Sequence, residues 1–154
     1  MDEKIRPFRA LGINIVKNKK LLLLFAMKRL REVEMRISNE YKRQEIRCPV
    51  HLSVGQEAPS AALSLLVDKN DFSVSTHRGH AHYLAKGGSL KSFISEIYGK
   101  ASGCSSGKGG SMHLIDIEVK FMGTSAIVGN SIPTGTGLAL AAKLNKKDQI
   151  SIIH

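Results

Sequence analysis

The residues of this chain that could do chemistry are most concentrated in the segment 76–82, which reads Thr-His-Arg-Gly-His-Ala-His. The guanidinium of Arg78 offers a rigid fork of N–H donors that fits a phosphate or carboxylate. The imidazoles of His77, His80 and His82 can donate, accept or relay protons near neutral pH. The segment therefore predicts a site that handles an anion or a proton, and the arginine favours an anionic ligand.

Zinc is the main alternative for the three histidines. His77 and His80 are three residues apart, so a helix could present both on one face, but no Cys, Asp or Glu lies nearby in the sequence to complete four ligands. We therefore predict no metal site in this segment. One or two of the histidines could instead be ordinary hydrogen-bonded residues.

A long amphipathic helix is predicted upstream of the histidine segment, over residues 19–45. Cys48-Pro49 ends it, because the residue before a proline is disfavoured in helical geometry. Its apolar positions recur at steps of three and four, which indicates packing on a core or on a partner helix. These positions are Leu23, Met27, Leu30, Val33, Ile37 and Tyr41.

The elements that follow place the histidine segment at the end of a strand. Ser53 and Gln56 have the spacing of a capping box and predict a helix to about residue 67. Residues 72–75 alternate like a short strand. The segment therefore lies where open α/β sheets bind their ligands, beyond the carboxyl end of a strand.

The second half of the chain predicts further helices and strands around a glycine-rich loop at 99–112. The expected helices are 83–88, a helix capped by Ser89 that runs to Tyr98, and 134–144. The expected strands are 113–115, 126–128 and 149–153. The last strand is followed by no further element, so we read the chain as interrupted within a domain.

The glycine-rich loop does not match a known nucleotide fingerprint. The segment 103–109 has three residues between Gly103 and Gly107 where a P-loop has four, and Gly109 stands where Ser or Thr would hold magnesium. Gly135-Thr136-Gly137 lacks the third glycine of a dinucleotide fingerprint. Two interpretations stay open: the loop amides and Lys108 approach an anion, or the loop becomes ordered when a ligand or partner binds.

Composition sets limits on partners and location. The net charge is +10, and residues 1–47 carry 13 of the 23 Lys and Arg against 6 of the 13 Asp and Glu. A solvated helix face explains this excess, and with no Trp and few aromatics the chain is poorly supplied for base stacking, so we expect no nucleic-acid partner. Two distant cysteines, no signal peptide and a seven-residue apolar run at 21–27 predict a cytoplasmic protein without a membrane segment.

Four motifs in order resemble the alpha subunit of thiamine-diphosphate-dependent 2-oxo acid dehydrogenases, the pyruvate and acetoin dehydrogenase type in particular. The motifs are HLSVGQEA at 51–58, THRGH at 76–80, the loop from Gly103 to His113 that contains GKGGSMH, and IVG with Ile132-Pro133. The resemblance covers residues 20–154. It implies an α/β thiamine-diphosphate-binding fold, here an incomplete parallel-sheet domain at 19–154, preceded by a loosely ordered leader at 1–18.

The resemblance also implies roles for individual residues. His77 and Arg78 are expected to bind the diphosphate, and Ala126 and Val128 to border the thiamine rings. His51 and His80 are expected on the substrate side. The register between Asp116 and Ser125 is not fixed by the resemblance. No catalytic residue is assigned, and the Mg²⁺ that accompanies thiamine diphosphate is expected to be held by a Gly-Asp-Gly motif and an asparagine that this chain does not contain.

The implied activity is that of an oxidoreductase acting on oxo groups with a disulfide acceptor, within a two-alpha, two-beta heterotetramer. Its partners would be a beta subunit, a lipoyl-bearing acyltransferase and a separate chain that supplies the missing C-terminal part. We expect the isolated chain to be inactive. Three interpretations stay open: a truncated or split alpha subunit, a non-catalytic subunit-interaction module derived from the same family, and a small basic nucleic-acid-binding protein.

Overall fold

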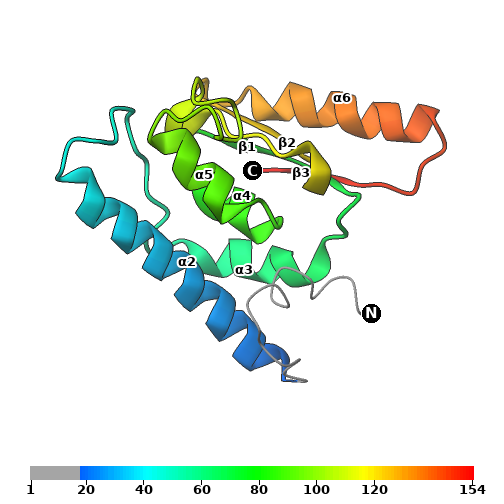
Figure 1. The fold of residues 1–154 in the computed structure, drawn as a ribbon. Coiled ribbons are helices and arrows are strands. Elements are labelled where there is room, and N and C mark those ends of the chain that lie inside the picture. Colours follow the sequence, from blue (N-terminus) through cyan, green and yellow to red (C-terminus); the bar gives the residue numbers. More distant parts are fainter. Residues whose placement is uncertain (1–17) are drawn as a thin grey trace.

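The computed structural model describes residues 18–154, which form an α/β fold around a small sheet (Figure 1). The predicted leader at 1–18 lies outside the described residues apart from Asn18, whose side chain caps the first helix by accepting from the Lys20 N–H at 3.0 Å. The helices are α2 (Lys19–Tyr41), α3 (Glu57–Leu66), α4 (His80–Ala85), α5 (Leu90–Ile97) and α6 (Ser131–Leu144), with short 3₁₀ turns at η2 (Gly110–Met112) and η3 (Ile117–Val119). The strands are β1 (Phe72–Thr76), β2 (Phe121–Ser125) and β3 (Ser151–Ile153).

The sheet has the strand order β2-β1-β3, and both neighbouring pairs are parallel. The connection from β1 to β2 carries α4 and α5, and the connection from β2 to β3 carries α6. Parallel strands need such crossover connections, and their carboxyl ends all meet at one edge of the sheet. The predicted α/β class with a parallel sheet is therefore confirmed.

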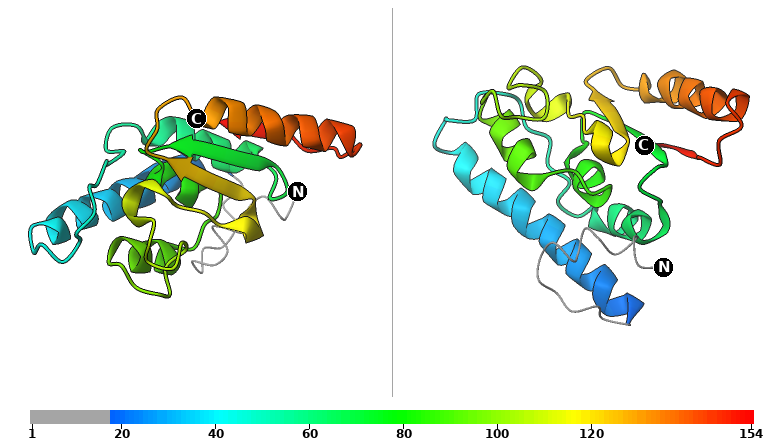
Figure 2. Two further views of the ribbon diagram at one scale, coloured as in Figure 1. Left: turned by 90° about the horizontal axis from the view of Figure 1, so that it is seen from above. Right: turned by 45° about the vertical axis from the view of Figure 1, so that its right-hand side comes forward.

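Helices cover both faces of the sheet (Figures 1 and 2). On one face α6 packs against β1 and β3. On the other face lie α4 and α5 together with α3, and α2 contacts α3 and α4 from outside. As a result α2 and α6 lie on opposite sides of the molecule in both figures.

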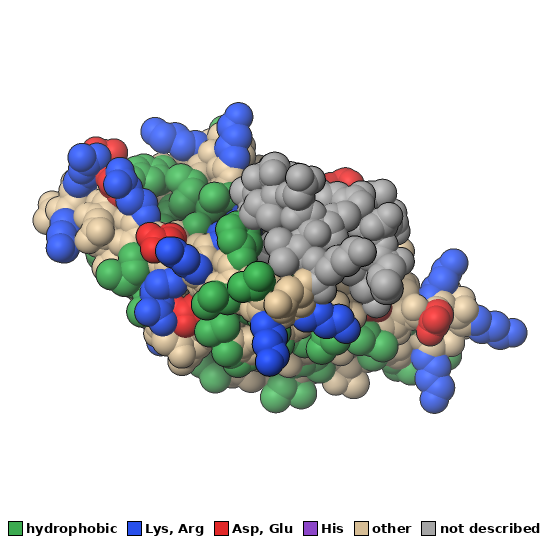
Figure 3. Space-filling view, turned by 90° about the horizontal axis from the view of Figure 1, so that it is seen from below, with side chains coloured by type: hydrophobic (Ala, Val, Ile, Leu, Met, Phe, Trp, Pro, Cys, Tyr) green, Lys and Arg blue, Asp and Glu red, His purple; other side chains and the backbone are tan. Residues whose placement is uncertain are grey.

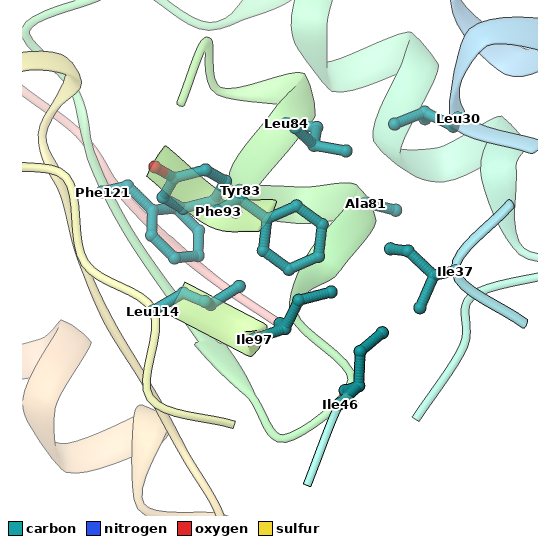
Figure 4. Packing of buried hydrophobic residues seen from close by; sticks show 10 residues of the cluster. All are labelled: Leu30, Ile37, Ile46, Ala81, Tyr83, Leu84, Phe93, Ile97, Leu114 and Phe121. Atoms are coloured by element: carbon teal, nitrogen blue, oxygen red, sulfur yellow. The ribbon is translucent and has the colours of Figure 1, made fainter. Parts of the chain in front are cut away.

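The main core fills the space between the sheet, α4, α5 and the middle of α2 (Figure 4). Tyr83, Phe93 and Phe121 are fully buried, and Tyr83 packs edge-on against Phe121 with ring centroids 5.4 Å apart. Burial of each such side chain contributes about 1.5–3 kcal/mol, so this aromatic group fixes α4 and α5 on the sheet. The rest of the cluster consists of Leu30, Ile37, Ile46, Ala81, Leu84, Ile97 and Leu114.

The long amphipathic helix is confirmed, although it ends at Tyr41 and its buried stripe is rotated from the predicted one. The buried positions are Leu22, Ala26, Leu30, Glu34 and Ile37. Tyr41, expected in the stripe, is 42% exposed and donates its hydroxyl to the Cys48 carbonyl at 3.2 Å. The helix stops before Cys48-Pro49 because residues 42–44 form a turn in which Gln44 has φ +60°.

The predicted capping box at Ser53 is wrong. The N-cap of α3 is Gln56, three residues later, and it makes no side-chain capping bond. Gly55, at φ +89°, turns the chain, and the Glu57 carboxylate accepts from the Gly55 N–H and from the Arg31 guanidinium. The Gln56 N–H, which the predicted box assigned to the Ser53 hydroxyl, donates to the Ser53 carbonyl at 2.9 Å instead.

The strands predicted at 113–115 and 126–128 are also wrong, since the second strand of the sheet is β2. Ile127 and Val128 have strong strand propensity but are 71% and 73% exposed. The strand β2 contains Gly123 and lacks a run of β-branched residues. Strand propensity therefore favoured residues 126–128 over the segment that forms the strand. By contrast, β1, the Ser89 cap of α5, α6 and β3 lie where the sequence predicts them, within three residues at each end.

Candidate functional site at the carboxyl edge of the sheet

The parallel register brings most of the predicted cofactor-binding residues to one edge. Thr76 at the end of β1 pairs with Ser125 at the end of β2. His77 and Arg78 follow the first strand directly, and Ala126 to Val128 follow the second. This edge is the place where open parallel sheets bind ligands. We name this group, His51, His77, Arg78, Ala126 and Val128, the strand-end site.

The turn after β1 packs so closely on β2 that only glycine fits in it. A Cβ at Gly79 would collide with the methyl group of Thr124 and lie 3.1 Å from the Thr76 carbonyl oxygen. Thr124 is itself fixed, because its hydroxyl donates to the Met112 carbonyl at 2.7 Å and accepts from the Leu114 N–H at 2.8 Å. The absence of a side chain at Gly79 therefore allows the two strand ends to lie side by side.

His51 joins the strand-end site although it is 26 residues from His77 in the sequence. The two imidazole rings meet edge to face with centroids 4.7 Å apart. The Arg78 guanidinium donates to the Leu52 carbonyl, which holds the segment around His51 against the turn. His51 Nδ1 and His77 Nδ1 are both buried, and neither has a hydrogen-bond partner among residues 18–154. Buried polar atoms of this kind ordinarily have a partner, so the pair supports a bound polar group at this place.

The electrostatics of the strand-end site favour an anion. Burial, followed by electrostatic repulsion from His77, Arg78 and His80, lowers the pKa of His51. The imidazole is therefore neutral at pH 7 and keeps one N–H donor and one acceptor. A negative charge placed among these groups would relieve their mutual repulsion and raise the pKa of His51 again.

Exposed apolar side chains lie beside this positive group. Ile127 and Val128 directly follow β2 and are 71% and 73% exposed. An exposed apolar pair next to cationic and imidazole donors suits a ligand that is anionic at one end and carries flat rings at the other. The residues present therefore fit thiamine diphosphate in chemical character.

His80 is separate from the strand-end site. It is fully buried, its Nδ1 donates to the Glu34 carboxylate at 3.1 Å, and its Nε2 lies 2.6 Å from the Ser111 hydroxyl. Glu34 is also fully buried, so these three residues connect α2, α4 and the glycine-rich loop inside the protein. In this chain His80 positions other elements, and its predicted place on the substrate side stays a prediction.

Glu34 was not among the residues singled out from the sequence. Its sequence position could have identified it, because Glu34 lies four residues after Leu30 and three before Ile37 and so falls within the buried stripe of α2. Charged residues are almost never fully buried without a partner, so its position demands one.

The glycine-rich loop is organised by a carboxylate of the protein itself. Glu96, at the end of α5, is fully buried and accepts four backbone N–H groups. The donors are Ser105 at 2.7 Å, Gly107 at 2.9 Å, Gly109 at 2.7 Å and Gly110 at 3.0 Å. Burial raises the pKa of Glu96, but these four donors outweigh it and lower the pKa overall. The expectation that the loop amides approach an external anion is wrong for these four groups, because Glu96 occupies them.

Residues 18–154 contain neither a metal-binding cluster nor a membrane-spanning helix. In that part of the chain no three or more His, Cys, Asp and Glu side chains are arranged to hold a metal ion. None of the helices described there combines the length and apolar character needed to cross a bilayer.

Comparison with known proteins identifies relatives over nearly the whole chain. The family model described as "Dehydrogenase E1 component" matches residues 25–154. The chain is 40% identical over 150 residues to the pyruvate dehydrogenase E1 component subunit alpha of Rickettsia bellii (strain RML369-C). The aligned residues cover 97% of this chain and 44% of that relative. It is 39% identical over 122 residues to the mitochondrial subunit alpha-1 of Arabidopsis thaliana, covering 79% of this chain and 31% of that protein. The chain therefore spans less than half the length of these relatives.

Proposed function

Because the chain belongs to the dehydrogenase E1 component family, we propose that it contributes the diphosphate-binding part of a thiamine-diphosphate-dependent pyruvate dehydrogenase alpha subunit. Residues 19–154 then form the N-terminal part of the cofactor-binding domain. The observation that carries this proposal is the register of Thr76 with Ser125, which sets His77 and Arg78 beside Ala126 and Val128.

The strand-end site supplies binding and orientation in this function. The Arg78 guanidinium donates one N–H to the Leu52 carbonyl, and its other N–H groups, which have no partner among residues 18–154, can donate to a diphosphate oxygen. His77 adds a second donor through its unpartnered Nδ1. Val128 offers apolar surface to the thiamine rings. Bound thiamine diphosphate supplies the electron sink for decarboxylation of a 2-oxo acid.

His51 acts on the substrate side in this proposal. Its lowered pKa keeps the imidazole neutral at pH 7, so it can donate one hydrogen bond to a carboxylate or carbonyl oxygen without holding a full charge. His80 and Glu34 support the site from within by fixing α4, which begins directly after the Arg78 turn. A beta subunit and a lipoyl-bearing acyltransferase are the proposed partners, the first to complete the cofactor site and the second to accept the product.

The proposal is tested by titrating the chain with thiamine diphosphate, with and without Mg²⁺, while the histidine ring protons are followed by NMR. Binding should shift the signals of His51 and His77 and raise the pKa of His51. Arg78→Ala removes charge-assisted hydrogen bonds worth about 1.5–3 kcal/mol, so affinity should fall roughly 10- to 100-fold. Lys147→Ala, which removes an exposed charge distant in sequence from the site, should bind like the unmodified chain. Unchanged His51 and His77 signals at millimolar ligand would refute the proposal.

The exposed surface of α6 favours a second candidate, a non-catalytic module that pairs with another subunit. The apolar residues of α6 are distributed around all sides of the helix. Only Ser131, Gly135 and Ala142 are buried, while Ile132 and Leu144 are 60% and 74% exposed. A helix that is apolar all round is typically covered on more than one side. Association with a beta subunit without any response to thiamine diphosphate would favour this candidate over the first.

A further inference from the structure

A cavity of about 800 Å³ lies away from the strand-end site, between the end of α2, the end of α5 and the glycine-rich loop. Its walls are the segments 43–49, 96–100 and 107–112. None of the strand-end residues lines it. Figure 3 shows Lys and Arg side chains, interspersed with Asp and Glu, at the end of the molecule where α2 ends, at the left of that view, and further Lys and Arg at the opposite end.

Cations outnumber carboxylates in the lining of this cavity, four to two. Arg43, Arg47, Lys100 and Lys108 line it, against the carboxylates of Glu45 and Glu96. Glu96 is already satisfied by its four loop amides, and only Arg43 among the four cations has an ion pair within residues 18–154, with Glu40 at 2.9 Å. Cations that face a concave surface without partners focus a positive potential there and attract anions.

One side of the cavity is apolar. Pro49, Ile97, Tyr98 and Met112 contribute to its lining together with the four cations. The volume lies within the range of sites for small organic ligands, about 300–1,000 Å³. We propose that this cavity binds a small organic polyphosphate of nucleotide size, with its phosphates on the cations and its organic part against Tyr98 and Met112.

The backbone of the cavity walls is held in fixed positions, and the side chains of the four cations extend from it into solvent. A Cβ at Gly107 would lie 2.7 Å from the Gly99 carbonyl oxygen and 2.8 Å from that of Lys100, which shows that the loop packs directly on the end of α5. A Cβ at Gly110 would lie 2.8 Å from the Cys48 Cβ, so the same loop also packs on the segment after α2. On the inner side of the loop, the buried Glu96 carboxylate accepts hydrogen bonds from four loop amides. A rigid backbone around the cavity limits the entropy that the loop loses when a ligand binds.

The first test measures binding of ATP and of inorganic triphosphate to the full chain by calorimetry, without Mg²⁺ and at low salt. ATP should bind more tightly than inorganic triphosphate, because only ATP has an organic part for the apolar wall. The double variant Lys100→Ala/Lys108→Ala should weaken ATP binding by at least roughly tenfold. The charge-matched double variant Lys143→Ala/Lys147→Ala, at the end of α6 and beyond it, should bind ATP like the unmodified chain.

The second test locates the ligand through Cys48, which lines the cavity. Alkylation of Cys48, followed by mass spectrometry, should slow several-fold when ATP is bound. Cys104 is the internal control, since it lies outside the lining and its alkylation rate should not change.

Two further results would overturn the proposal. In the first, Arg78→Ala abolishes ATP binding while Lys100→Ala/Lys108→Ala leaves it intact, which would place the ligand at the strand-end site. In the second, the two double variants weaken ATP binding equally, which would indicate an effect of net charge alone. Equal affinities for ATP and inorganic triphosphate would refute the role of the apolar wall.

Discussion

Glu96→Gln should destabilise the chain substantially while changing its shape very little. The carboxylate accepts two N–H groups on each oxygen, those of Gly109 and Gly110 on Oε1 and those of Ser105 and Gly107 on Oε2. Glutamine keeps one acceptor oxygen and turns the other into an NH₂ donor, which leaves two buried amides without an acceptor. Each unsatisfied donor costs about 1–3 kcal/mol, and removal of a buried charge recovers part of that cost, so we expect a net loss of about 2–4 kcal/mol.

The loss is measured as a shift in the urea unfolding midpoint, with Glu118→Gln, which alters an exposed carboxylate, as the matched control. Amide exchange of Gly107 and Gly109 should accelerate only in the Glu96 variant. Because the folded-state pKa of Glu96 lies below its ordinary value of 4.5, the folded chain binds fewer protons than the unfolded chain, and the stabilisation is lost as the pH falls below that value. The difference between the two variants should therefore shrink at low pH. Equal midpoints at pH 7 would refute the role assigned to Glu96.

Two further predictions concern α6 and the histidine pair behind the sheet edge. A Cβ at Gly135 would clash with Ile153 of β3, whereas a Cβ at Gly137 would meet open space, so Gly135→Ala should cost about 1–3 kcal/mol and Gly137→Ala should gain about 0.5–1 kcal/mol in urea unfolding. Equal effects of these two changes would contradict the packing of α6 on the sheet. The rings of His82 and His154 stack with centroids 3.7 Å apart, and burial lowers the pKa of His82 to about 3 and that of His154 to about 4. The unfolded chain binds more protons below pH 6.5, so stability should fall from pH 7 to pH 4, and His82→Asn should reduce this slope; a slope unchanged in that variant would show that the pair does not cause it.

The location of the strand-end site could be predicted from the sequence because it depends on local signals and one general rule. The alternation of residues 72–75 indicates a strand, and ligands in parallel sheets bind beyond the carboxyl ends of strands. His77 and Arg78 lie at the sheet edge as predicted, although the second strand is β2 and not the predicted segment 126–128. The error was harmless because β2 ends at Ser125, directly before the residues predicted to border the ligand.

The internal carboxylates could not be predicted because their partners are distant in the sequence. Glu34 meets His80 across 46 residues, and Glu57 meets Arg31 across 26. Glu96 is closer to its loop, but nothing in a run of Gly and Ser reveals that its amides converge on one side chain. A glycine-rich loop next to a lysine has the composition of an anion site whether the anion is a ligand or a carboxylate of the protein, and only the fold distinguishes the two.

The three histidines in the segment 76–82 contact three different parts of the protein, and helix geometry explains why they diverge. His77 lies in the turn before α4 and faces His51 at the strand-end site. His80 and His82 lie on α4 two residues apart, so their side chains point about 200° apart around the helix axis. His80 therefore reaches Glu34 and Ser111, while His82 reaches Ser75 on β1 at 2.7 Å and stacks on His154 beyond β3. Of the three, only His77 retains a buried ring nitrogen without a partner among the described residues, so it is the histidine of this segment that is free to bind a ligand.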